Sequence, residues 1–454
     1  MGQGRRPARP MMRWSLVALA AVTAVLVLAP AALANGGVAP LWSTTWNAKT
    51  PGVVTNVHVA KTPTGEIYTA CSLLRATTGK YDVIVARYRA NGTREWVKSW
   101  SRGTSYDDMV EGIAVDPDGR LVVCGWSATG KDDGTPDWSI LKFGRVGNLL
   151  WSKSIGSAFG GDDRAVDVVI NKYGRIYVTG YVTQSSSGKD WRTVKLKPTG
   201  AQVWSVSYKC SEGLDDQPAA MAIDAEGNLY VTGWAGTAKK VRRDAVTIRY
   251  GRDGTRAWVM RFHDGGEEMG VDVAVRLSGV VVAVKKIDEN AQHTYALAKQ
   301  YTRDGDDLWT ATLDDANTVT DEFLCAGIDS SARGVFGGFS IDEATADSSA
   351  RLSQYNASGV SEWSFSQSAA GALPGDQFND LFVAISGTTW ATGSIGGHAV
   401  TWSFDAAGAQ RWYGWTGVYD TVNATSGDAM SVTSKYVYVA GRSGDSLVLM
   451  KYVR

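Results

Sequence analysis

Acidic residues recur at one spacing along this chain, and they are the first candidates for chemistry. An Asp stands 17 residues before a Gly in five places, Glu268 takes the acidic position in a further unit, and Asp428 takes it in the last, shorter hairpin. Carboxylates gathered at one place could bind a cation, with calcium as the candidate, or perform acid–base catalysis. In the alternative interpretation, each accepts backbone N–H groups and fixes a loop to a strand. Regular repetition favours this structural role, as does Val54, which interrupts the series in the first unit. The seven acids are Asp108, Asp163, Asp216, Glu268, Asp321, Asp376 and Asp428.

Aromatic residues form a second repeated set near these acids. Four of them directly follow the Gly that ends a strand, and two open another strand of the same unit. Aromatic rings beside carboxylates can hold sugar rings by stacking, while the acids hydrogen-bond the hydroxyl groups. In the alternative interpretation, the rings fill the space between neighbouring sheets. The six candidate ligand-binding residues are Trp126, Trp138, Tyr181, Trp191, Trp234 and Phe339.

Other reactive residues show no catalytic spacing. The four histidines lie in different units without a metal-binding pair, and neither a Gly-x-Ser-x-Gly elbow nor a phosphate-binding Gly loop is present. We therefore predict no catalytic residues and favour a protein that is not an enzyme. Cys71 and Cys124 lie in neighbouring units, whose sheets should be about 10 Å apart, too far for an undistorted disulfide. Cys210 and Cys325 are expected to be single buried thiols.

The elements that position these residues are set by a repeat of about 53 residues. An aromatic residue or Leu is followed by Gly four residues later and by Trp after four more, seven times without a change in spacing. Gly supplies the positive φ of a tight hairpin, so each occurrence predicts a strand, a turn and a strand. Four strands per repeat predict an all-β protein, a β-propeller. The seven triplets are 88/92/96, 143/147/151, 196/200/204, 250/254/258, 301/305/309, 355/359/363 and 404/408/412.

The two ends of the chain complete the count of blades. The segment at Trp42 has no preceding strand, and the last unit, ending at Tyr452, has no Trp strand after it. We predict eight four-stranded blades, with the N-terminal strand paired to the C-terminal blade so that the ring closes without exposed sheet edges. Seven blades would result if a terminal unit packed elsewhere.

The repeat resembles a known one. Gly-Asn-Leu-Tyr-Val-Thr-Gly at residues 227–233, followed by Thr-Ile-Arg-Tyr at 247–250 and Gly254, is similar to the SBBP-type β-propeller repeat of exported bacterial proteins. This resemblance covers nearly all of the chain after residue 34 and implies a fold, not an activity. The Gly-x-x-x-Trp hairpin also resembles the tryptophan-docking repeat of eight-bladed quinoprotein dehydrogenases, in which the Trp of one blade packs on its neighbour. Those enzymes carry adjacent cysteines beside the quinone, and no Cys-Cys occurs in this sequence.

Composition and the N-terminus indicate the compartment. Four arginines precede an apolar run from Trp14 to Leu28, and an Ala-x-Ala sequence at residues 32–34 follows, so we predict a signal peptide over 1–34 and a single propeller domain over 35–454. The chain has 46 basic and 46 acidic residues, and the four N-terminal arginines leave the remainder mildly acidic, which argues against nucleic acid as a partner. No later run is long enough to span a membrane. We expect a secreted monomer.

The connections predict which face binds. Turns within hairpins are short and constant, whereas the connections from second to third strand and from one blade to the next are long and variable. Because strand direction alternates, all the long loops emerge on one side, and binding residues commonly lie on such loops. The leading hypothesis is a non-catalytic propeller that binds an extracellular protein or polysaccharide there, with no predicted cofactor. The alternatives are a polysaccharide lyase or hydrolase using channel-mouth carboxylates, a quinone-dependent oxidoreductase, and a structural protein of the cell envelope.

Overall fold

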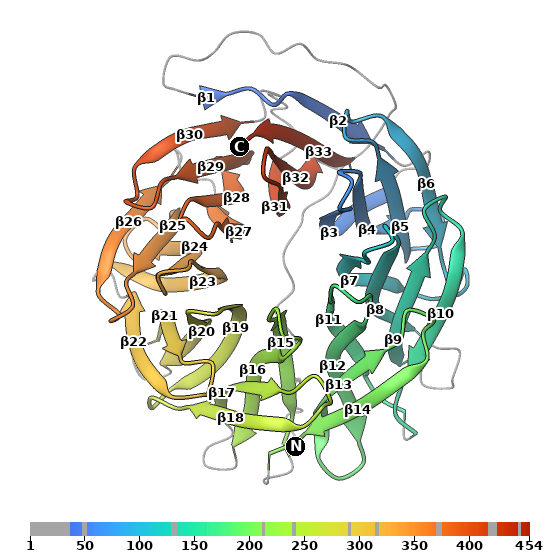
Figure 1. Ribbon diagram of the computed structural model, residues 1–454, viewed down its shortest axis with the longest axis horizontal. Helices are drawn as coiled ribbons and strands as arrows, with labels where there is room; N and C mark the ends of the chain where they lie inside the picture. The colour runs from blue at the N-terminus through green and yellow to red at the C-terminus, as the bar shows by residue number, and fades with distance from the viewer. Residues whose placement is uncertain are drawn as a thin grey trace, which may run out of the picture.

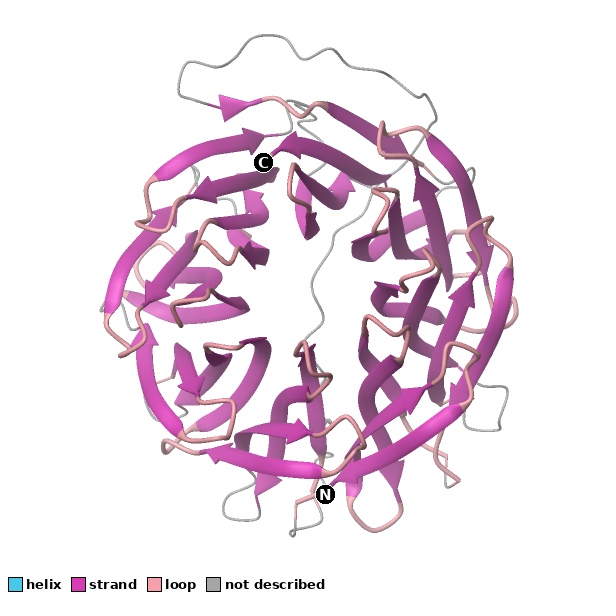
Figure 2. Ribbon diagram, viewed as in Figure 1, coloured by secondary structure: helices cyan, strands magenta, loops and turns pink. Residues whose placement is uncertain are grey.

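The described part of the chain consists of β-strands joined by turns and loops, without a helix (Figure 2). The computed structural model describes residues 37–47, 52–128, 135–158, 160–210, 214–237, 242–288, 292–313, 317–368, 375–415, 425–443 and 446–454. The predicted signal peptide over 1–34 lies outside these residues. Within them, no helix is long and apolar enough to cross a membrane.

Four-stranded antiparallel sheets are arranged around a central axis as a β-propeller (Figure 1). Each sheet is called a blade and is named after the strand that lies nearest the axis. The first four blades, written from the inner strand outward, are β3 (Gly52–Lys61), β4 (Ile67–Arg75), β5 (Lys80–Tyr88), β6 (Arg94–Trp100); β7 (Asp108–Val115), β8 (Leu121–Ala128), β9 (Pro136–Phe143), β10 (Leu149–Ile155); β11 (Arg164–Ile170), β12 (Ile176–Gln184), β13 (Gly188–Leu196), β14 (Gln202–Tyr208); and β15 (Asp216–Ile223), β16 (Leu229–Thr237), β17 (Arg242–Tyr250), β18 (Arg256–Phe262).

The remaining strands follow the same order. A single parallel bridge between Thr294 and Thr320 joins two of these blades into one eight-stranded sheet. The strands are β19 (Glu267–Arg276), β20 (Gly279–Asp288), β21 (His293–Tyr301), β22 (Asp307–Leu313); β23 (Thr318–Ile328), β24 (Gly334–Asp342), β25 (Ser348–Tyr355), β26 (Ser361–Gln367); β27 (Gln377–Val383), β28 (Thr389–Ile395), β29 (His398–Phe404), β30 (Gln410–Trp415); and β31 (Thr425–Val432), β32 (Tyr436–Ser443), β33 (Ser446–Val453).

Strands from the N-terminal end of the described chain lie on the last two blades. β2 (Trp42–Trp46) pairs antiparallel with β33, placing Trp42 opposite Lys451, and thereby adds the outer strand to the β31 blade. The short strand β1 (Gly37–Val38) pairs in parallel with β30. The β31 blade therefore combines segments from both ends of the chain (Figure 1).

The repeated Gly and Trp meet at the junctions between blades. The indole N–H of Trp96 donates to the carbonyl of Arg145 at 3.0 Å, and that of Trp258 to the carbonyl of Arg303 at 3.0 Å, in each case in the hairpin turn of the next blade. The indole lies against the turn Gly, where a Cβ would approach it to about 3 Å or less. Seven tryptophans thus pack on the turn of the neighbouring blade, as the resemblance to the tryptophan-docking repeat implied, and this contact explains the invariant spacing within the chain. The turn glycines with a Trp against them are Gly92, Gly147, Gly200, Gly254, Gly305, Gly359 and Gly408.

Carboxylates also join inner strands in pairs. An Asp beside a β-bulge in β11, β19 or β27 accepts a backbone N–H from the inner strand of the next blade, at 2.9, 2.8 and 2.7 Å respectively. In β3, Asn56 instead donates to the carbonyl of Val110 at 2.9 Å. These hydrogen bonds therefore connect the inner strands in pairs. The pairs are β3 with β7, β11 with β15, β19 with β23, and β27 with β31. The three bridges through Asp are Asp167 to Met221, Asp272 to Ala326 and Asp380 to Met430.

The four cysteines are buried free thiols. Cys71 and Cys124 lie in adjacent blades without a disulfide, as expected from the sheet spacing, and burial raises the pKa of Cys71 to about 12. Cys210 and Cys325 are single buried thiols as predicted.

Candidate functional site

The acids of the repeat lie where inner strands begin, on the side of the molecule called here the long-loop face. All seven are at most 6% exposed, and five accept backbone N–H groups. Asp163, for example, accepts from Ser157 in the preceding connection and from Thr183 at the end of its own second strand, both at 2.5 Å. These are the contacts of the structural role, since four of the acids fix the preceding connection between blades to the sheet that follows, and Asp376 holds the turn at Gly396 in its own blade. The five are Asp108, Asp163, Asp216, Glu268 and Asp376.

The other two acids have different partners. Asp321 accepts hydrogen bonds from the hydroxyls of Thr318 and Ser340. Asp428 receives the guanidinium of Arg442 at 2.6 and 3.0 Å. The register also shows that Asp428 is not equivalent to the other acids, because it occupies the β-bulge of β31, whereas the position corresponding to Asp376 is Thr425. The prediction that Asp428 occupies the repeated acidic position was therefore wrong. The hairpin of this blade is shorter, which shifted the alignment of its residues with the other units.

Two of the six predicted ligand-binding aromatics belong to the core. Trp138 and Trp191 are 0% exposed, and their indole N–H groups donate to the backbone carbonyls of Tyr181 and Trp234 in the next blade at 2.8 and 3.1 Å. A ring with no accessible surface cannot stack on a sugar. Both residues therefore serve the packing between blades, which is the alternative that the sequence left open.

The other four aromatics follow the second-strand Gly near the start of the inner strands. Trp126, Trp234 and Phe339 are partly exposed, whereas Tyr181 is 4% exposed. The guanidinium of Arg164 lies 4.4 Å from the ring centroid of Trp126, and that of Arg243 lies 4.6 Å from the ring of Trp234. Each accessible indole is therefore paired with an arginine, a cation–π arrangement that keeps the guanidinium in place beside the ring.

Asp162 organises the charges between two of these aromatics. It accepts from Arg164 at 2.5 Å and from Lys189 at 2.6 Å, and the hydroxyl of Tyr181 donates to it at 3.3 Å. Lys189 also lies 4.4 Å from the centroid of Tyr181. Burial alone would raise the pKa of Asp162, but the two cations hold it below its ordinary value. The aromatic residues of the β7 and β11 blades thus belong to one network of rings and paired charges.

Sequence reasoning missed a cluster at the junction of the β15 and β19 blades. Asp244, His263 and Glu268 place their possible ligand atoms within 4.8 Å of one another, the only group of its kind among the described residues. His263 is isolated in the sequence, and Asp244 lies in a third strand, 19 residues upstream. One sequence pattern could have indicated this cluster, namely the Asp that recurs in the third strand of several units. Besides Asp244, it is present as Asp82, Asp137 and Asp190.

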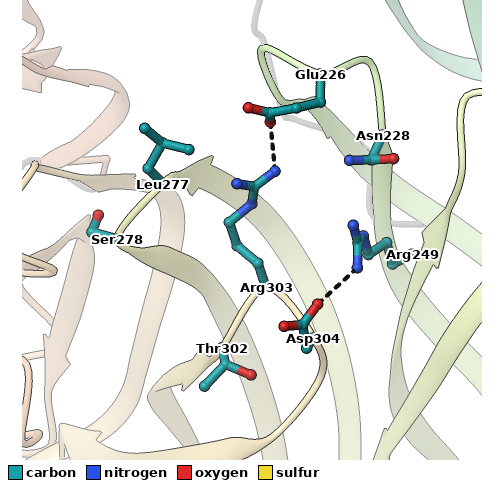
Figure 3. A pocket seen from close by; sticks show the side chains of 8 residues that line it. All are labelled: Glu226, Asn228, Arg249, Leu277, Ser278, Thr302, Arg303 and Asp304. Carbon is teal, nitrogen blue, oxygen red and sulfur yellow. Dashed lines mark hydrogen bonds and ion pairs between the residues drawn. The ribbon is translucent and has the colours of Figure 1, made fainter.

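A polar hollow lies at the opposite end of the same two blades (Figure 3). Its volume is about 530 Å³, and short hairpin turns rather than long loops form it. Arg303 crosses from the β21–β22 turn to Glu226 at 2.5 Å and to Asp224 at 2.6 Å, while Arg249 pairs with Asp304 at 3.2 Å. Ion pairs between the two blades therefore cross the hollow. The side chains that line it are Glu226, Asn228, Arg249, Leu277, Ser278, Thr302, Arg303 and Asp304.

Comparisons with known proteins add partial structural similarities. No protein family and no curated protein matches the sequence. A eukaryotic initiation factor is 10% identical with a TM-score of 0.45, over 90% of this chain and 92% of the other. The β-propeller domain of the Trilobed protease from Pyrococcus furiosus is 9% identical with a TM-score of 0.44, over 80% and 96%. The polysaccharide lyase Uly1 is 9% identical with a TM-score of 0.44, over 76% and 90%.

Proposed function

We propose that the chain is an exported, monomeric β-propeller of eight blades, of the SBBP-type repeat, which binds a polysaccharide at its long-loop face without catalysis. The eight-bladed ring is supported by the pairing of β2 with β33. Export is supported by the basic, apolar and Ala-x-Ala sequence over residues 1–34. The choice of ligand depends on the aromatic residues of the long-loop face.

The observation that carries the proposal is the pairing of accessible indoles with arginines. Trp126 and Trp234 stand at equivalent positions of two blades, each partly exposed and each with a guanidinium beside its ring. The exposed part of an indole offers an apolar surface to a sugar ring. The fixed guanidinium offers several donors to sugar hydroxyls or to the carboxylate of an acidic sugar. Phe339 provides a further partly exposed ring at the equivalent position of the β23 blade.

A non-catalytic role is proposed because the repeated acids are buried and already accept hydrogen bonds within the protein. Asp163 and Asp216 each accept two backbone N–H groups, and both are almost fully buried. An acid that acts on a glycosidic bond must reach the substrate. The acids of the repeat are thus better placed to fix loops than to protonate a polysaccharide.

The proposal is tested by affinity electrophoresis of the mature protein through gels containing neutral and acidic polysaccharides. We expect retardation by at least one polysaccharide, and an apparent affinity at least about 10-fold lower for the double variant Trp126→Ala/Trp234→Ala, since two anchoring rings together contribute more than about 1.4 kcal/mol. Tyr173→Ala is the matched control, because Tyr173 is 72% exposed but lies in a short hairpin turn on the opposite face. Retardation by none of the polysaccharides, or equal retardation of the double variant, would contradict the proposal.

A further inference from the structure

The cluster at the β15–β19 junction brings one nitrogen and two carboxylate oxygens together. Nδ1 of His263 lies 3.2 Å from Oδ1 of Asp244 and 3.3 Å from Oε2 of Glu268. Asp244 comes from β17, His263 directly follows β18, and Glu268 comes from β19. The third strand of one blade, the residue that follows its outer strand and the inner strand of the next blade therefore each supply one ligand atom.

Each carboxylate uses one oxygen for support and directs the other at the histidine. Oδ2 of Asp244 receives Nε of Arg261 at 2.6 Å, and Oε1 of Glu268 receives the backbone N–H of Gly266 at 2.9 Å. Asp244 is 7% exposed, yet within the described residues its Oδ1 accepts no hydrogen bond. An unpartnered buried carboxylate oxygen is costly unless a cation or a proton occupies the position it faces. Outer partners that hold ligand carboxylates in this way are typical of metal sites.

The structure points to a metal ion at this position, and we propose that Asp244, His263 and Glu268 bind Zn²⁺. Zinc takes imidazole nitrogen and carboxylate oxygen at about 2.0–2.1 Å, which places two ligand atoms of a tetrahedron about 3.3 Å apart. The two separations from Nδ1 of His263, 3.2 and 3.3 Å, match this geometry, and all three ligand atoms lie within 4.8 Å of one another. Calcium would need six to eight oxygen ligands. The side chain of His263 is 52% exposed, so the fourth position faces solvent.

Neighbouring junctions show that the histidine is the distinctive element. At the preceding junction, burial raises the pKa of the inner-strand acid Asp216 to about 6, and the nearby charge of the third-strand Asp190 adds a smaller upward contribution. The residue that follows the fourth strand there is Lys209, in the place of His263. Paired carboxylates therefore recur as part of the repeat, while His263 turns one pair into a three-ligand site.

The test is isothermal titration of Zn²⁺ into mature protein that has been freed of metal by chelation and of any purification tag. We expect saturable binding at a stoichiometry of one per chain, a zinc-dependent rise in Tm, and an affinity at least about 10-fold weaker in His263→Gln. Binding of Co²⁺ should give the visible absorption of a tetrahedral site in the wild type and not in this variant. His293→Gln is the matched control, because His293 lies 3.6 Å from the single carboxylate of Asp321, and its titration should equal that of the wild type.

His263 is half-exposed at the end of a strand, so its substitution should leave the fold intact, which circular dichroism will verify. The competing occupant is a proton on Nδ1 held between the two carboxylates. Absence of saturable Zn²⁺ binding in the wild type, or equal affinity in His263→Gln, would overturn the proposal in favour of that proton. This measurement does not depend on polysaccharide binding, so the zinc proposal and the polysaccharide proposal are tested independently.

Discussion

At the scale of single residues, the contact between a turn Gly and the preceding blade's Trp defines the repeat. Gly359 has φ of +80°, and a Cβ at this position would lie 2.8 Å from Cγ of Trp309. Two independent requirements thus exclude a side chain, namely the left-handed backbone and the space already filled by the indole. This double constraint accounts for a spacing that does not vary along the chain.

Gly359→Ala should lower the free energy of unfolding by about 2–4 kcal/mol, since both the strained φ and the displaced indole contribute. Gly79→Ala should cost only about 1–2 kcal/mol, because Gly79 has φ of +65° but a Cβ there would meet no atom within 4 Å. Urea unfolding followed by tryptophan fluorescence measures both. Equal losses in the two variants would show that the indole contact contributes nothing beyond backbone strain.

At the scale of elements, the bridging carboxylates make adjacent inner strands sensitive to pH. Burial between the blades raises the pKa of Asp272 to about 7, against the two backbone hydrogen bonds it accepts, and the charges of Asp380 and Asp167 raise it further. Burial likewise raises the pKa of Asp167 to about 6. Because the folded pKa exceeds that of the unfolded chain, the protonated form is favoured by folding. The associated stabilisation is fully present below about pH 4 and is lost as the pH rises through about 7.

Asp272→Asn should therefore change how stability depends on pH. The variant loses one hydrogen bond at every pH. Because an Asn side chain does not titrate in this range, the variant does not share the loss of stability that the wild type undergoes as Asp272 ionises. The free energy of unfolding of the variant, relative to that of the wild type, should therefore increase between pH 5 and pH 8. Urea midpoints across this range provide the measurement. A difference between the two proteins that stays constant with pH would show that Asp272 titrates normally in the fold.

At the scale of the whole molecule, strands from both ends of the described chain join the β31 blade to the β3 blade. Trp42 in β2 packs against the turn at Gly92 and donates to the carbonyl of Ala90 at 3.3 Å. Lys451 in β33 donates to the same carbonyl at 2.8 Å across 361 residues of sequence. A junction made of both termini therefore uses the same Trp-on-turn contact as junctions between consecutive units.

Trp42→Ala should lower the free energy of unfolding by about 2 kcal/mol, because a partly buried indole and its hydrogen bond are removed. Leu41→Ala is the neighbouring control, since Leu41 is 55% exposed and should change stability by less than about 0.5 kcal/mol. Thermal unfolding by calorimetry compares the two. If Trp42→Ala unfolds at the wild-type temperature, β2 does not stabilise the junction between the β31 and β3 blades.

Local rules were enough to predict the blades from the sequence. A tight turn with positive φ needs Gly wherever it occurs, and alternating strands need apolar residues at fixed intervals, so Gly200 and Trp204 are informative without knowledge of distant segments. The buried acids could be assigned a structural role for the same reason, since a residue repeated in unit after unit serves the unit. Among the acids, the regular spacing gave a wrong alignment at Asp428, where the last unit departs from the repeat.

The candidate sites depended on the tertiary structure, because they lie between blades. Whether an aromatic is a core residue or an accessible surface is decided by the neighbouring sheet, which covers Trp138 and Trp191 but leaves part of Trp126 exposed. Likewise, the ligand atoms of Asp244, His263 and Glu268 come within ligand distance only when the β15 and β19 blades are packed side by side. Sequence by itself therefore determined the repeating unit, whose causes are local backbone conformation and strand periodicity. Packing between units decided which side chains remain available for binding, because burial and ligand geometry are properties of surfaces that meet only in the folded propeller.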